Sequence, residues 1–375
     1  FRSLAFAVCA CDFEPDLTQN TPTDKAYETL QDVQNGTIGA YQALGYYPFL
    51  GNYAIAYGDF AGGLADGSSS SGHFYAQSNW AVSETDAELE GIWQYGFMVV
   101  DRTVRTINGA NKVLATSANL TDKDKATLYY NKSQCFGLRA LAYFTLSNFF
   151  CKPYNKGIEG KGLPIIKDKP VEAFENSTRA SLGDTYQFIC DDIDSALVNS
   201  EKAGQQSLQY FYMNKAAIYA LKARVNLYMG KYDVAEAAAK KAIELKGKGN
   251  GTSTDTDPTD ETYLNMWASV NVTDEDIFTI SKTENDNLSA NALNTLYGSY
   301  NGSVSEYCSG FFAATDIRAN LIGTVDSNKG GCRKYQGLET SQATSNIPVF
   351  RKSEMALIIA ECEARIGSLD EAKKY

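Results

Sequence analysis

Histidine is nearly absent from this chain, in which His73 is the single imidazole among 375 residues. A Ser-His-Asp or Cys-His catalytic arrangement would have to use that side chain. It lies beside the serine- and glycine-rich stretch 67–72, and no G-x-S-x-G nucleophile motif occurs in the chain. One histidine without clustered cysteines also excludes the common zinc patterns. We therefore expect no catalytic residues, no metal site and no cofactor, and we predict that the protein is not an enzyme.

Runs of basic residues and long apolar runs are missing as well. The net charge is −11 and no Lys/Arg cluster is large enough to hold phosphates, so we expect no nucleic-acid partner. No segment approaches the ~20 apolar residues of a membrane span. Acidic clusters do occur, at 191–194, 255–261 and 274–276. The first of these is expected to form a solvated helix face. A glycosidase would need two carboxyl groups roughly 5–10 Å apart across a cleft.

Two of the eight cysteines, Cys9 and Cys11, lie at the N-terminus in a pattern typical of an exported lipoprotein. The chain opens with FRSLAFAVCAC, an arginine and a short apolar run that ends in small residues and cysteine. We predict a signal-peptide remnant at 1–10, lipidation at Cys11 and a lipid-anchored tether at 11–22. A buried first strand is the alternative. The six other cysteines show no C-x-x-C spacing, and nothing in that spacing demands a disulfide.

Two stretches of the chain have the same residue spacing, which predicts a helical hairpin in each. In 223–235 and again in 360–372, an alanine lies seven residues before a glycine (Gly230 and Gly367). An aspartate follows each glycine at +3 and an alanine at +5. Glycine ends a helix easily and aspartate can cap the next one. The pattern is typical of tetratricopeptide-style helix pairs.

Apolar periodicity predicts the remaining helices and leaves two long segments unassigned. We expect helices at 23–44, 85–115, 120–150, 181–199, 212–229 and 232–246, a strand-like stretch at 275–281, and a helix from 350 onward. Segments 45–85 and 283–348 are rich in glycine, serine, asparagine and aromatics. Loops of this length in compact folds are usually functional or disordered.

These patterns predict a mainly α fold: a tetratricopeptide-like helix-pair superhelix with long irregular loops packed on it. We expect a single domain over 23–375, with N-terminal helices and loops at 23–210 and the repeat and loop region at 211–375. The second hairpin stops at Tyr375 within its partner helix. We therefore read the sequence as a C-terminally truncated fragment of a longer protein.

Several segments, taken in order, resemble the SusD/RagB family of Bacteroidetes outer-membrane lipoproteins. The matching segments are CDFEP at 11–15, IWQY at 92–95, GLRALAYFTL at 137–146, TRASLGDTYQFI at 178–189, NKAAIYALKARVNLY at 214–228 and FRKSEMALIIAECEARIG at 350–367. Each alone is a generic helix, but their order is specific. The stretch NFFCKPY at 148–154 departs from the phenylalanine-glycine-proline ending usual in the family.

The resemblance implies four helix pairs, surface exposure on the cell outer membrane, and capture of nutrients for a SusC-like TonB-dependent transporter. Most such proteins take glycans, so we expect an oligosaccharide ligand. A peptide ligand is the alternative, and a loop-borne glycosidase is the less favoured one. The ligand residues of the family are not a fixed motif and cannot be carried over.

Candidate ligand contacts come instead from composition. The chain has 24 tyrosines and 3 tryptophans, and aromatic rings stack well on sugar faces. We select the aromatic and amide residues of the two long segments: Tyr75, Asn79 and Trp80 in the first, and Tyr297, Tyr300 and Tyr307 in the second. Trp80 is the strongest candidate. The alternative is that its side chain packs against the helices and fills the loop. Trp267 is expected to be structural.

Overall fold

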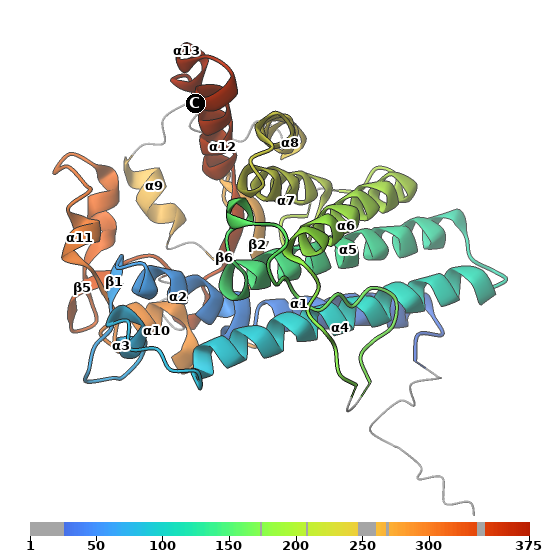
Figure 1. Ribbon diagram of the computed structural model, residues 1–375, viewed down its shortest axis with the longest axis horizontal. Coiled ribbons are helices and arrows are strands. Elements are labelled where there is room, and N and C mark those ends of the chain that lie inside the picture. Colours follow the sequence, from blue (N-terminus) through green and yellow to red (C-terminus); the bar gives the residue numbers. More distant parts are fainter. Residues whose placement is uncertain (1–25, 173–174, 208, 247–259, 268–269, 336–341) are drawn as a thin grey trace, which may run out of the picture.

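The computed structural model describes residues 26–375 except 173–174, 208, 247–259, 268–269 and 336–341. The predicted signal remnant, Cys11 and the tether lie outside the described residues. Within them the chain is mainly helical, as predicted (Figure 1). No described helix is long and apolar enough to cross a membrane.

The long helices form the scaffold, and the first five of them begin with a side-chain cap. They are α1 (Leu30–Leu44), α4 (Ala87–Thr116), α5 (Asp122–Phe150), α6 (Leu182–Ala203), α7 (Lys215–Tyr228), α8 (Tyr232–Lys246) and α12 (Lys352–Ile366). Thr121 and Asp124 form a capping box at α5, and Thr29 and Asp32 form one at α1. The α1 box makes that helix begin at Leu30, later than the predicted residue 23.

The helices pack as successive pairs. α4 lies against α1 and α5, α5 against α6, and α7 against α8, while α12 covers α8 and α7 (Figure 1). Small residues allow this close packing: Ala235, Ala239 and Ala242 on α8 are fully buried. The helix-pair superhelix predicted from the sequence is confirmed.

The two hairpins end their first helices differently. Gly230 adopts φ 73°, the left-handed conformation expected of a helix-terminating glycine. Gly367 has φ −110° instead. The predicted aspartate caps are wrong: Asp233 lies within the first turn of α8, and Ser368 rather than Asp370 caps the short α13 (Leu369–Ala372) by accepting from the Glu371 amide.

The segment 45–85 was predicted as one long loop, but it contains a π-helical turn η1 (Tyr47–Gly51), α2 (Tyr53–Ala61), strand β1 (Ala65–Asp66) and α3 (Tyr75–Ser78). Phe49, Phe60 and Phe74 are fully buried or nearly so. Each element is too short to reveal its period in the sequence, and burial of these aromatic rings stabilises them.

The segment 283–348 also holds short elements: η3 (Ser289–Asn291), α10 (Leu293–Tyr297), β3 (Ser303–Val304), α11 (Glu306–Ser309), η4 (Ile317–Leu321), β4 (Ile322–Val325), β5 (Asn328–Cys332) and η5 (Gln342–Thr344). The predicted strand near 275–281 is confirmed as β2 (Asp276–Ile280), which pairs antiparallel with β6 (Ile347–Arg351). β4 pairs with β5 and β1 with β3. The remaining elements are η2 (Tyr154–Lys156) and α9 (Asp260–Met266).

The acidic cluster at 191–194 is not the solvated face we expected. Asp191 and Asp194 are exposed, but Asp192 is 2% exposed and forms an ion pair with the equally buried Arg139 of α5. The prediction failed for Asp192 because its partner lies 53 positions away in the sequence.

Candidate functional site

The two long segments that carry the candidate ligand contacts meet in space. β1 pairs with β3 through Ala65–Val304 and Asp66–Ser303. Just beyond this pairing, the Ser305 hydroxyl donates to the Gly63 carbonyl at 2.7 Å. In Figure 1, α2, α3 and β1 lie beside α10, α11 and β5, at one end of the molecule and away from α7 and α8. The fold therefore places both segments on one side of the helix scaffold.

Side chains join the two segments a second time. The His73 ring stacks on the Tyr300 ring with centroids 4.1 Å apart and planes 13° apart. The Ser71 hydroxyl donates to the Tyr300 carbonyl at 2.6 Å. The two long segments and their side chains form what we call the candidate face. His73 has a structural contact in it through Tyr300, which is half-buried.

Trp80 projects from an anchored turn. Its amide donates to the Gln77 carbonyl, and Ala81 closes the turn by donating to the Ala76 carbonyl. The Gln77 amide group is buried and donates to the carboxylates of Asp86 and Glu88. This network fixes the backbone while 80% of the Trp80 side chain remains exposed. The alternative that Trp80 plugs the loop against the helices is therefore wrong.

Tyr75 and Asn79 precede Trp80 on the same turn, and both are exposed. The Asn79 Nδ2 donates to the Tyr75 carbonyl at 2.7 Å, which orients the amide and leaves its oxygen available as an acceptor. On the second segment, Tyr307 of α11 is 66% exposed and packs edge-on against Phe311, itself 62% exposed. Phe311 was missed from the sequence, because it lies beyond the end of the short helix α11 and no periodicity marks it.

Tyr297 does not belong to the exposed face, so its prediction as a ligand contact is corrected. Its side chain is 6% exposed, its ring stacks on Phe60 at 5.6 Å, and its hydroxyl donates to Asp59 Oδ2 at 2.8 Å. Burial raises the pKa of Tyr297 well above its ordinary value and also raises the pKa of Asp59. Tyr297 stabilises the core between α2 and α10.

Trp267 is structural, as predicted. It is 6% exposed at the end of α9, with Lys334 Nζ 4.4 Å and Arg351 Cζ 5.0 Å from its ring centroid. Cations above an aromatic ring are attracted by its electron-rich face. Burial lowers the pKa of Lys334.

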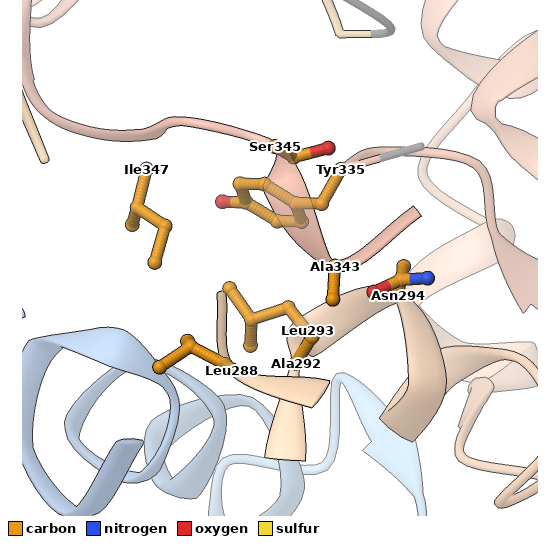
Figure 2. Close-up of a pocket in the computed structure, with 8 residues that line it drawn as sticks. All are labelled: Leu288, Ala292, Leu293, Asn294, Tyr335, Ala343, Ser345 and Ile347. Atoms are coloured by element: carbon orange, nitrogen blue, oxygen red, sulfur yellow. The ribbon is translucent and has the colours of Figure 1, made fainter. Parts of the chain in front are cut away.

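The cavity in Figure 2 is too small for a sugar. It lies between Leu293 on α10, Tyr335 and Ile347, and its volume of about 10 Å³ holds about one water molecule. Among the described residues, no group of three or more His, Cys, Asp or Glu side chains is placed to hold a metal ion. We keep the exposed aromatic turn as the candidate for ligand contact because the Trp80 ring is 80% exposed there.

Comparison with known proteins decides the family. Residues 20–227 match the model of the SusD-like family, described as starch-binding and associating with the outer membrane. This span is more than half of the chain. The chain belongs to the SusD-like family. A search of curated proteins finds no match.

Solved structures share the SusD-like fold. A SusD superfamily protein from Bacteroides vulgatus is 24% identical with a TM-score of 0.78, covering 92% of this chain and 78% of that one. One from Bacteroides thetaiotaomicron is 23% identical with a TM-score of 0.77 and the same coverages. Surface glycan-binding protein A from Bacteroides thetaiotaomicron, solved in complex with laminarihexaose, is 16% identical with a TM-score of 0.65, covering 92% and 81%.

The residues that match the SusD-like family model include only some of the candidate ligand contacts. The matched span contains Tyr75, Asn79 and Trp80 and stops before Tyr300 and Tyr307. The stretch 148–154, which departs from the usual family sequence, is held by specific hydrogen bonds. α5 ends at Phe150, whose carbonyl accepts from Arg179 Nη2 at 2.5 Å. The linker beyond it is held by the Tyr143 hydroxyl, which donates to the Pro164 carbonyl.

Proposed function

We propose that this SusD-like chain is a surface-exposed glycan-binding lipoprotein that captures cargo for a TonB-dependent, SusC-like transporter. The observation that carries the proposal is the Trp80 ring, 80% exposed on a turn that backbone hydrogen bonds close and the Gln77 side chain anchors to Asp86. The hydrogen-bonded backbone of the turn presents this apolar ring to solvent before a ligand arrives, which lowers the entropic cost of binding. The family description and the laminarihexaose complex of a distant structural neighbour support a glycan as that ligand.

The binding chemistry follows from the side chains of the turn. The face of Trp80 stacks on the apolar face of a sugar ring, and Tyr75 adds a second ring with a hydroxyl. The free Asn79 oxygen accepts from a sugar hydroxyl, with water bridging the remaining polar groups. Such a shallow, wet site gives modest affinity, which suits a protein that passes its cargo to a transporter.

The location is proposed on separate grounds. The outer-membrane association in the family description supports it, and so does the cysteine at position 11 after a short apolar run. Lipidation of Cys11 would hold the helical body at the membrane. Metabolic labelling with a palmitate analogue tests this: label should enter the wild type and be lost in Cys11→Ala, and equal labelling of both would contradict it.

A glycan and peptide array tests the ligand class. The wild type should bind one or more glycans, and Trp80→Ala should weaken that binding by about tenfold or more, equivalent to ~1.4 kcal/mol. Leu357→Ala, at an exposed apolar residue on α12, is the matched control and should bind as the wild type does. Unchanged binding by Trp80→Ala would refute the site. Peptide binding without glycan binding would favour the peptide-binding alternative.

Hydrolysis tests the enzyme alternative. Incubation of the purified protein with each glycan that it binds should leave the chain length of that glycan unchanged. Release of shorter products by the wild type would show the loop-borne glycosidase instead.

A further inference from the structure

A hollow of about 420 Å³ lies beside α1, and none of the candidate ligand contacts lines it. Its volume is within the range of about 300–1,000 Å³ that is usual for small-molecule pockets. Its walls come from α1, from the turn before α7, and from the end of β2 with the turn that follows. We call it the α1 pocket. The lining residues that carry its chemistry are Ile38, Tyr41, Tyr212, Ile280, Lys282 and Asp286.

One wall of the α1 pocket is apolar and aromatic. Ile38 and Tyr41 are three residues apart and therefore share one face of α1, where Ile38 is 51% exposed. The Tyr41 hydroxyl donates to Gln134 Oε1 at 2.8 Å and accepts from the Met213 amide at 2.6 Å. Tyr212 packs edge-on against the Tyr41 ring, with centroids 5.4 Å apart. These contacts hold the wall in place before a ligand arrives.

Lys282 supplies the positive charge of the pocket. It lies two residues after β2, and its amide donates to Asn346 Oδ1 at 3.1 Å. Its side chain is 4% exposed. Within the described part of the chain its ion-pair partner is Asp286, whose Oδ2 lies 3.4 Å from Nζ and whose side chain is 63% exposed. Charge-assisted hydrogen bonds are usually about 2.7–2.9 Å long, so Asp286 compensates the buried ammonium only in part.

The end of α1 lies against the same ammonium. A Cβ at Gly45, the residue that ends α1, would lie 3.5 Å from Lys282 Nζ. The C-terminal end of a helix carries a negative charge of roughly half a unit, which favours a cation. Burial nevertheless lowers the pKa of Lys282, although Asp286 opposes this shift. The buried charge is therefore under-compensated by the protein, and a full negative charge from outside would stabilise it.

We propose that the α1 pocket binds a small aromatic monocarboxylate, with its carboxylate on the Lys282 ammonium and its ring against Ile38 and Tyr212. The exposed Asp286 side chain then turns outward to water. Its backbone stays in place, because Thr283 and Asp286 exchange two backbone hydrogen bonds of 3.2 Å. A single ammonium beside an apolar wall suits one negative charge on an apolar body, whereas a doubly charged phosphate would bring charge that the pocket cannot pair. This inference goes beyond the proposed function and does not depend on it.

Three probes with the same ring and different charge test the ligand class: benzoate, benzyl alcohol and benzylamine. Saturation-transfer NMR titrations of the full chain at pH 7 measure their dissociation constants. Benzoate should bind the wild type with a dissociation constant on the order of 1 mM, and the neutral and cationic probes should bind about fivefold or more weakly. Benzoate binding no tighter than that of benzyl alcohol would overturn the inference.

Substitutions at the two charged positions locate the carboxylate. Lys282→Met keeps an apolar side chain of similar length and removes the ammonium, so the benzoate dissociation constant should rise about tenfold. Asp286→Asn removes the competing carboxylate and should lower that constant about threefold. A gain in affinity cannot come from a folding defect. Lys241→Met, at a half-buried lysine of α8 outside the pocket, is the matched control and should bind benzoate as the wild type does.

The outcomes separate this inference from the proposed function. Unchanged benzoate affinity in Lys282→Met, or no gain in Asp286→Asn, would overturn the inference, because the carboxylate would then not lie on the Lys282 ammonium. Thermal unfolding of each variant checks that the fold is retained, and if Lys282→Met unfolds, Asp286→Asn decides. Trp80→Ala should bind benzoate as the wild type does. A wild type that binds benzoate but no glycan would overturn the proposed function alone.

Discussion

Arg139 and Asp192 form a bidentate ion pair in the interior of the α5–α6 interface. Nε and Nη2 of the guanidinium lie 2.7 Å from the two carboxylate oxygens, and both side chains are 2% exposed. Arg139 Nη1 also donates to the Lys167 carbonyl, which ties the linker after α5 to the same point. Both charges are thus compensated in a site that water does not reach.

Removing one partner should be costly. Asp192→Ala leaves the guanidinium buried without its carboxylate, and we expect the free energy of unfolding to fall by about 3–5 kcal/mol. Urea unfolding followed by circular dichroism measures this. Asp191→Ala is the matched control, since its side chain is exposed on the neighbouring position, and it should change stability by less than about 0.5 kcal/mol. Similar effects of both substitutions would show that the ion pair is not the source of stability.

Trp80 adopts a left-handed backbone conformation, φ 56°, in which a side chain is strained. Trp80→Gly should therefore be more stable than Trp80→Ala by up to about 1 kcal/mol, because glycine relieves the strain. Asn79 has φ −98°, so at that position the order should reverse, with Asn79→Gly less stable than Asn79→Ala. Chemical unfolding of the four variants tests this. The same order at both positions would contradict a strained Trp80.

The Tyr300 ring should control how tightly the two segments of the candidate face are held together. Tyr300→Ala removes the stack on His73, worth about 1 kcal/mol. We expect amides in 65–80 to exchange about fivefold faster, with no change in α7 and α8. Hydrogen exchange followed by mass spectrometry reports both regions. Tyr307→Ala, whose ring packs on Phe311, should not accelerate exchange in 65–80. Unchanged exchange in Tyr300→Ala would count against this role.

Asp59 should give the stability a pH dependence of predictable sign. Burial raises its pKa above the ordinary 3.8, although the Tyr297 hydroxyl and Lys334 oppose the shift. The folded protein therefore binds this proton at a higher pH than the unfolded chain does. The resulting stability is fully present below pH 3.8 and is lost as pH rises through the folded-state pKa.

Asp59→Asn lacks this titration. The unfolding free energy of the wild type minus that of Asp59→Asn should consequently be more positive at pH 4 than at pH 7. Denaturant titrations at the two pH values measure the difference. An equal difference at both would show that Asp59 has no raised pKa.

The long helices could be predicted because their signals are local. Apolar periodicity runs along each helix, and caps such as Thr121 with Asp124 lie within a few residues of the helix that they begin. The short elements of 45–85 and 283–348 could not, because each is stabilised by a partner far away in the chain. β1, for example, has only two residues and depends on β3.

The candidate face was predictable only in part. The polar composition around Trp80 correctly indicated an exposed ring. Tyr297 and Tyr300 are three residues apart and looked equivalent in the sequence. Only the packing of Tyr297 on Phe60 and its hydrogen bond to Asp59 distinguish a core residue from one in the face.

The contact between Ser305 and Gly63 joins positions 242 residues apart, whereas successive helices such as α7 and α8 meet after a short turn. Closing so long a loop has a large entropic cost, and contacts of this range form slowly compared with local ones. We therefore expect the helix pairs to assemble early and the Trp80 face to close late in folding. A chain interrupted during synthesis before residue 305 would carry the helix pairs up to α8, without α12 and without the contact that joins the two segments of the candidate face.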